Sequence, residues 1–150
     1  LKRHPGARLR VICDRKPKFH RVPAELVDWA TWSPEIEFSA LQDLTVGLMP
    51  LADTEWSRGK CAFKMLTYMA CGIPVVVSPV GMNAEILGKA DVGFGARALD
   101  DWVGAIDTLL KDPSLRARMG QNGRELVESS YSVHALAPRF AAILKEIASA

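Results

Sequence analysis

The chain has 150 residues, of which 49% are hydrophobic and 24% are charged, and its formal net charge is +2 at pH 7. These values predict one domain over residues 1–150 with an apolar core, and the scattered positive charges exclude a general nucleic-acid-binding surface. The most apolar stretches, such as residues 44–51 and 73–77, are too short to cross a bilayer, so no transmembrane segment is expected.

The three cysteines, Cys13, Cys61 and Cys71, form neither an even disulfide set nor a Cys-x-x-Cys motif. This pattern suits a reducing compartment, so we expect a cytoplasmic protein whose cysteines lie in the core. The three histidines are dispersed, and no metal site is expected. The first residues contain neither an initiator Met nor an apolar signal core, so we interpret the chain as an N-terminally truncated fragment.

The first third of the chain predicts two strands and one short helix. Residues 9–13 are apolar between turn-forming residues, which indicates a strand, and residues 14–23 lack any period and predict a loop. Residues 27–32 are compatible with a second strand. A proline and acids at the start of residues 34–41 predict a brief helix.

The central third alternates between strand and helix patterns. Residues 44–51 are almost continuously apolar, as in a strand that is covered on both faces, and a polar loop follows over residues 52–59. Apolar residues recur every three or four positions over residues 62–70, and Gly72 stands where a helix would end. The β-branched residues of 74–78 then predict another strand.

A short helix over residues 84–87 and a strand over residues 92–94 are expected next. Three longer helices follow, one capped by Asp100 and Asp101, one after Pro113 and one from Ser132. The apolar stripe of the last helix is expected in the core: Phe140, Ile143, Leu144 and Ile147.

This alternation predicts an α/β fold, a doubly wound, Rossmann-like parallel sheet with helices on both faces. Ligands of such sheets bind beyond the carboxyl ends of the strands. Two segments that follow predicted strands, residues 52–64 and 78–85, are therefore the candidate site.

The first of these segments places Glu55, Arg58, Gly59 and Lys60 directly before a helix that carries Lys64. Free amides at a helix start attract anions, and cationic side chains add charge-assisted contacts, so this segment is a candidate phosphate site. The residue types alone fit a solvated loop and an exposed helix face slightly better.

The second segment carries Ser78, Gly81, Asn83 and Glu85 after a strand. Backbone amides near Gly81 could bind a diphosphate or a sugar, although a simple capped turn explains the same residues. Trp56 could stack on a base, but core packing or a lid contact is the more ordinary role for it.

The string KMLTYMACGIPVVVSPVG, residues 64–81, resembles the signature of group 1 glycosyltransferases of the family 4 type. In that family a helix ending in Glu-Ala-Met-Ala-x-Gly leads into Pro-Val-Val, a Gly-rich turn and a glutamate, which Glu85 matches. The resemblance extends from about Asp43 to Tyr131.

The resemblance implies the C-terminal half of a GT-B enzyme, in which two Rossmann-like domains face each other across a cleft. The C-terminal domain of such enzymes holds a nucleotide-activated sugar, commonly without a metal, so no cofactor is expected and a nucleotide-sugar is the expected ligand. The acceptor domain would be the missing N-terminal partner within the same chain. The first strand of the donor domain, whose loop usually carries a basic pair, is also missing from this sequence.

The family usually carries two glutamates separated by seven residues, and here these positions hold Gly59 and Thr67. Glu55 could replace the first glutamate if the loop contains extra residues, and the Thr67 hydroxyl could bind a ribose. Lys60 and Lys64 are the preferred phosphate contacts, with backbone amides of residues 59–62. The full set expected to bind the donor is Glu55, Arg58, Gly59, Lys60, Lys64, Thr67, Gly81, Asn83 and Glu85.

These observations favour a glycosyltransferase that moves a hexosyl unit from a nucleoside diphosphate sugar to an unknown acceptor, with retention implied by the resemblance. No catalytic residue is identified, and the isolated fragment is expected to be inactive. A GT-B-like binding or scaffold subunit is the first alternative, because the glutamate pair is missing. A nucleotide-sugar epimerase is the second, although no acid and base for it are apparent.

Overall fold

The structure is a computed structural model that describes residues 3–149. The chain divides into two compact units, Leu1–Leu44 and Thr45–Ala150, and each contains its own parallel sheet. The prediction of one domain over residues 1–150 did not anticipate this division. No helix within the described residues is long and apolar enough to cross a membrane.

The first unit contains the two predicted strands, β1 (Leu9–Cys13) and β2 (Val27–Thr31), which pair in parallel. A loop and the 3₁₀ turn η1 (Ala24–Leu26) connect them. Arg10 and Asp28 are register partners, and their side chains form an ion pair with Nη2 and Oδ2 2.7 Å apart. Opposite charges on neighbouring strands support this register.

The helix predicted over residues 34–41 is wrong. Turns occupy most of this stretch, and only the 3₁₀ segment η2 (Ser39–Leu41) is helical. Eight residues are too few to offset the cost of starting a helix without tertiary support. Leu41 is nevertheless buried, with 5% of its surface exposed.

The second unit is built on three parallel strands, β3 (Gly47–Met49), β4 (Val75–Val77) and β5 (Gly93–Gly95), in the spatial order β3-β4-β5. They confirm the three strands predicted for this region, although β3 is much shorter than the apolar run of residues 44–51. The crossover helices are α2 (Phe63–Ala70) and α3 (Met82–Leu87).

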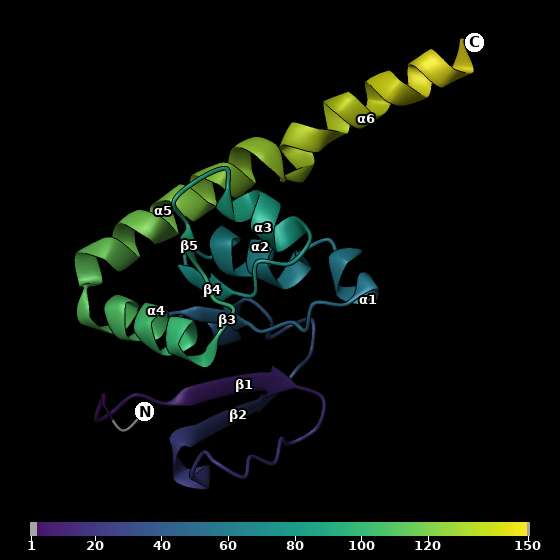
Figure 1. Ribbon diagram of the computed structural model, residues 1–150. Coiled ribbons are helices and arrows are strands. Elements are labelled where there is room, and N and C mark those ends of the chain that lie inside the picture. The colour runs from purple at the N-terminus through teal and green to yellow at the C-terminus, as the bar shows by residue number, and fades with distance from the viewer. Residues whose placement is uncertain (1–2, 150) are drawn as a thin grey trace. The chain divides into compact units, whose positions relative to one another are not determined.

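Helices cover both faces of this sheet. Figure 1 shows α2 and α3 on one side and α4 (Leu99–Lys111) on the other, while α5 (Pro113–Ser130) contributes side chains to both cores. Alternate residues of β4 point to opposite faces, so Val75 and Val77 join the first core and Val76 the second. The predicted doubly wound, Rossmann-like α/β architecture is confirmed.

Helices α2 and α5 pack closely because α5 carries glycines at their interface. A Cβ atom on Gly120 would overlap the carbonyl of Gly72, and one on Gly123 would lie 3.1 Å from Cγ of Met69. The glycines that weaken the helical pattern in the sequence therefore serve the packing of an uninterrupted helix.

The last helix, α6 (Val133–Ala148), begins at the predicted residue, since the Ser132 hydroxyl accepts a hydrogen bond from the Ala135 amide (3.1 Å). Its predicted burial is wrong, because no described residue of α6 is buried. The exposed fractions of its expected core residues are 63% for Phe140, 53% for Ile143, 51% for Leu144 and 68% for Ile147. The helix period was correct, but a period does not show whether another element covers the stripe.

Two local predictions also need correction. The expected polar loop of residues 52–59 contains a single helical turn, α1 (Glu55–Arg58), with Thr54 as its N-cap residue. A cap can close one turn that shows no apolar period in the sequence. Cys61 is exposed and not in the core, while Cys13 and Cys71 are half-buried.

Candidate functional site

The candidate site lies where β3, β4 and β5 end, because the carboxyl ends of parallel strands meet at one edge of the sheet. Hydrogen bonds join the first two loops that leave this edge. The amide of Ser78 donates to the Met49 carbonyl (3.1 Å), and the Ser78 hydroxyl accepts from the Leu51 amide (2.9 Å). The chain segments that follow β3 and β4 are thus held together from their first residues.

Gly81 brings the same two loops into direct contact. Its φ is +54° and its ψ is −133°, a conformation that side-chain-bearing residues avoid. A Cβ at this position would overlap the carbonyl oxygen of Arg58 and lie 2.9 Å from its Cα. The two segments that the sequence singled out separately therefore form one continuous surface.

Arg58 is tied to a residue that the sequence analysis did not select. Its Nε donates to Oδ1 of Asp53 over 2.7 Å. This hydrogen bond is the main cause that lowers the pKa of Asp53, which therefore stays ionised. The sequence does show an acid five residues before an arginine, just after a predicted strand. This spacing does not distinguish an ion pair from two separately solvated charges.

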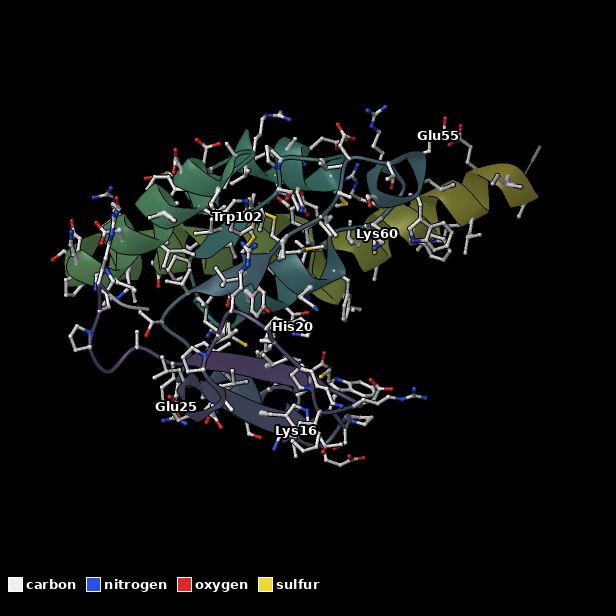
Figure 2. The ribbon with its side chains drawn as sticks, turned by 60° about the horizontal axis from the view of Figure 1, so that its bottom comes forward. Lys16, His20, Glu25, Glu55, Lys60 and Trp102 are labelled. Atoms are coloured by element: carbon white, nitrogen blue, oxygen red, sulfur yellow. The ribbon has the colours of Figure 1, made fainter. Side chains whose placement is uncertain are left out.

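Lys60 and Lys64 lie on the surface on either side of the start of α2. Neither lysine forms an ion pair with a carboxylate in residues 3–149, so both charges are available to a ligand. Figure 2 labels Glu55, the first residue of α1, and Lys60, two residues beyond the end of that helix, and both are exposed.

The backbone between these lysines is conformationally unusual. Ala62 is almost fully buried, with 1% of its surface exposed, and it takes the left-handed conformation (φ +55°) as the residue that precedes α2. Such strain in a residue other than glycine is concentrated at functional sites. It directs the chain from the exposed Cys61 into the first turn of α2.

The backbone amides that are available to a phosphate differ from those that the sequence predicts. The amides of Gly59 and Lys60 donate to the carbonyls of Glu55 (3.2 Å) and Ser57 (3.3 Å), and these bonds close α1. They are therefore occupied, and the expectation that both would serve a phosphate is wrong. The first-turn amides of α2 take their place as candidate phosphate donors, because a helix leaves its first amides without intrahelical partners.

Three further predicted residues have distinct surroundings. Thr67 is half-buried on α2 and its hydroxyl donates to the Phe63 carbonyl (2.9 Å), so its oxygen keeps only acceptor capacity. Asn83 is 1% exposed and its amide group donates to the Ser78 carbonyl (3.1 Å), which fixes the turn. Glu85 is exposed on α3.

Two large aromatic side chains of α1 and α2 are exposed to solvent. Trp56 on α1 is 80% exposed and Phe63 at the start of α2 is 65% exposed. The core role considered for Trp56 is therefore wrong, and stacking on a planar ligand stays open to it. The described residues contain no group of three or more His, Cys, Asp or Glu side chains arranged to hold a metal ion.

The fold places this chain in a known class of domain, the Rossmann-like half of GT-B proteins. The structure resembles that of sucrose-phosphate synthase from Thermosynechococcus elongatus with a TM-score of 0.68 and 20% sequence identity. The similarity covers 84% of this chain and 31% of that protein, so the chain spans about a third of its length.

The family comparison is more specific. Residues 61–126 match the sequence profile of the family described as glycosyl transferases group 1. This match confirms the resemblance noted in the sequence, and it includes α2, β4, the Gly81 turn and α5 as far as Leu126. No curated protein matches the chain significantly.

Proposed function

We propose that this chain is the nucleotide-sugar-binding half of a glycosyltransferase that transfers a hexosyl unit from a nucleoside diphosphate sugar. The observation that carries the proposal is the joined surface at the carboxyl edge of the sheet. There the Gly81 turn touches the Arg58 backbone, and Lys60 and Lys64 lie exposed near the start of α2. The group 1 match over residues 61–126 supports the same function.

The chemistry that this surface supports is stabilisation of the leaving group. In transfer, the bond from the anomeric carbon to the diphosphate breaks, a bond to the acceptor oxygen forms, and the proton of the acceptor hydroxyl passes to the departing diphosphate. Negative charge grows on the departing diphosphate. The first amides of α2 are fixed before that charge develops, which is the arrangement that lowers such a barrier, and the exposed ammonium groups of Lys60 and Lys64 add positive charge beside them.

The remaining residues are assigned to binding. Glu55 and Glu85 carry exposed carboxylates that accept hydrogen bonds from sugar hydroxyls, and the Thr67 oxygen accepts one from a ribose hydroxyl. Asn83 acts indirectly by holding the Ser78 carbonyl. Retention at the anomeric carbon belongs to this proposal through the family, and the acceptor-binding groups are assigned to the other half of the enzyme.

A thermal-shift screen tests the proposal. A ligand that binds only the folded state must raise its melting temperature, so one class among UDP-, GDP-, ADP- and dTDP-glucose is expected to raise the Tm of this protein. Lys60→Ala is expected to weaken that binding by roughly 10- to 100-fold, because a hydrogen bond to a charged group contributes about 1.5–3 kcal/mol.

The matched control is Lys145→Ala, which removes an exposed lysine from α6. It is expected to leave binding unchanged. If no nucleotide sugar raises the Tm of the folded protein, the proposal is wrong. If Lys60→Ala binds the nucleotide sugar as tightly as the parent and Lys145→Ala do, the phosphate role of Lys60 is wrong.

A second function is favoured by one specific observation. Gly59 and Thr67 occupy the positions where the resembling family carries its glutamate pair, which suits a subunit that binds a nucleotide sugar without transferring it. Release of nucleoside diphosphate by the complete two-domain protein separates the two functions. Binding without release favours the binding subunit, and release in the presence of an acceptor excludes it.

A further inference from the structure

Helix α6 carries an apolar stripe that is exposed along its whole length. Figure 1 shows α6 continuing beyond the end of α5, away from the three-stranded sheet. No described residue of this helix is buried, and Val133 in its first turn is 83% exposed. A helix of 16 residues gains most of its stability by packing an apolar face against another element. We therefore expect a partner to cover the stripe.

The stripe has the seven-residue spacing of a coiled coil. The a positions hold Val133, Phe140 and Ile147, and the d positions hold Leu136 and Ile143. In a coiled coil, side chains at these positions insert between those of a partner helix. Pro138, which lies inside α6, occupies an f position on the side of the helix opposite this seam. The proline therefore does not obstruct a partner helix.

Charged residues beside the seam distinguish the two ways in which a second copy can pair. Arg139 and Glu146 occupy the two g positions, and neither forms an ion pair within residues 3–149. In an antiparallel pair the g positions of the two helices face each other. With Phe140 packed against Ile143, Arg139 of each copy then lies opposite Glu146 of the other. In a parallel pair g faces e, and Arg139 would face the apolar Leu144.

The antiparallel orientation also suits the rest of the molecule. Helix α6 is joined to α5 at its N-terminal end, and its C-terminal end extends away from the sheet (Figure 1). An antiparallel pair places the two sheets at opposite ends, whereas a parallel pair would bring them side by side. The other titratable side chains of α6, His134 and Lys145, occupy b and f positions away from the seam.

We propose that the stripe of α6 is an interface between two copies of this chain, which pair through antiparallel α6 helices. Both copies contribute the same surface, so the interface is closed by a two-fold axis and gives a dimer. Leu136 packs against Ile147 of the other copy on either side of the central layers, and Leu144 meets Ala137. This inference is independent of the proposed function, because α6 lies outside the loops of the candidate site.

Sedimentation velocity at increasing protein concentration tests the proposal. Two heptads form a short seam, so a dimer with a Kd in roughly the micromolar range is expected. Phe140→Asp places a charge in the central layers and is expected to weaken the dimer at least about 100-fold. Phe140 is 63% exposed in the single chain, so the variant should keep its fold, which circular dichroism checks. Lys145→Ala changes an f position and is the control.

Charge reversal tests the orientation. Arg139→Glu and Glu146→Arg each place like charges opposite each other at both ends of the antiparallel seam, so each is expected to weaken the dimer roughly tenfold. A mixture of the two single variants is expected to form a heterodimer close to the parent in affinity, because opposite charges then face each other again. The double variant should likewise recover the parent affinity. A parallel pair would show neither recovery.

Other results would overturn the proposal. A chain that stays monomeric at all concentrations, or a dimer that Phe140→Asp leaves intact, shows that the stripe is not the interface. A complete two-domain protein that is monomeric and loses thermal stability on Phe140→Asp shows that its other half covers the stripe instead. Binding to phospholipid vesicles that Phe140→Asp abolishes, without any dimer, assigns the stripe to a membrane surface.

Discussion

Gly81 and Ala62 both take a positive φ beside the candidate site, 54° and 55° respectively. For Gly81 the cause is visible, because a side chain would collide with the backbone of Arg58. For Ala62, burial of the side chain at the start of α2 offsets the cost of the strained conformation. At the residue scale, the backbone conformations of Gly81 and Ala62 shape the site. The charged side chains are carried by the segments that these two residues hold together.

Gly81→Ala is therefore expected to separate the two loops. A strained positive φ costs about 1–3 kcal/mol, and the collision with Arg58 adds to it, so the Tm should fall and nucleotide-sugar binding should weaken. The control is Gly104→Ala on α4, where a Cβ meets nothing within 4 Å. That change should stabilise the protein by about 0.5–1 kcal/mol, since alanine favours a helix interior. Equal melting temperatures for both variants would contradict this account of the turn.

Asp101 fixes the start of α4 through its ionised carboxylate. Hydrogen bonds from the backbone, first that of Ala98 and then that of Arg97, lower its pKa. A group with a lowered folded-state pKa stabilises the fold above its unfolded pKa, and this stabilisation is lost as the pH falls through the folded value. Asp101→Asn should therefore lower the Tm at pH 7, and the difference from the parent should shrink toward pH 2. Asp100→Asn is the neighbouring control, and a pH-independent difference for Asp101→Asn would show that its charge is not involved.

At the scale of elements, sequence periodicity predicted the strands and helices that bury a face. The β-branched run of β4 and the apolar spacing of α2 are local signals, and both elements lie in the core. The single turn α1 is too short to show an apolar periodicity, because it consists of four residues after one N-cap residue. For α6 the period is present, but whether its stripe is covered depends on residues far away in space.

The interface of α2 and α5 provides the test at this scale. Gly120→Ala should destabilise the protein by about 1–3 kcal/mol, because the new methyl group overlaps the backbone carbonyl of Gly72 and forces the helices apart. Urea unfolding monitored by circular dichroism measures the change, with Gly104→Ala again as the control. An increase in stability for Gly120→Ala would mean that helix propensity outweighs the packing and that the close approach is not essential.

At the scale of the whole molecule, the sequence predicted the class of fold and the order of its elements. It also selected the two loops that meet at the carboxyl edge. The contact between Gly81 and the backbone of Arg58 could not be predicted, because it joins segments that follow two different strands. The division of the chain into two compact units likewise depends on which segments pack together.

The most direct test of the central claim is whether a nucleotide sugar covers Cys61. This thiol is exposed between Lys60 and Ala62, while Cys13 lies half-buried in the other unit and serves as an internal reference. Alkylation of each cysteine is followed by mass spectrometry with and without a saturating nucleotide sugar. The account predicts that the ligand slows alkylation of Cys61 at least several-fold and leaves the rate at Cys13 unchanged. Saturating binding with no protection of Cys61 would contradict a nucleotide-sugar site at the start of α2.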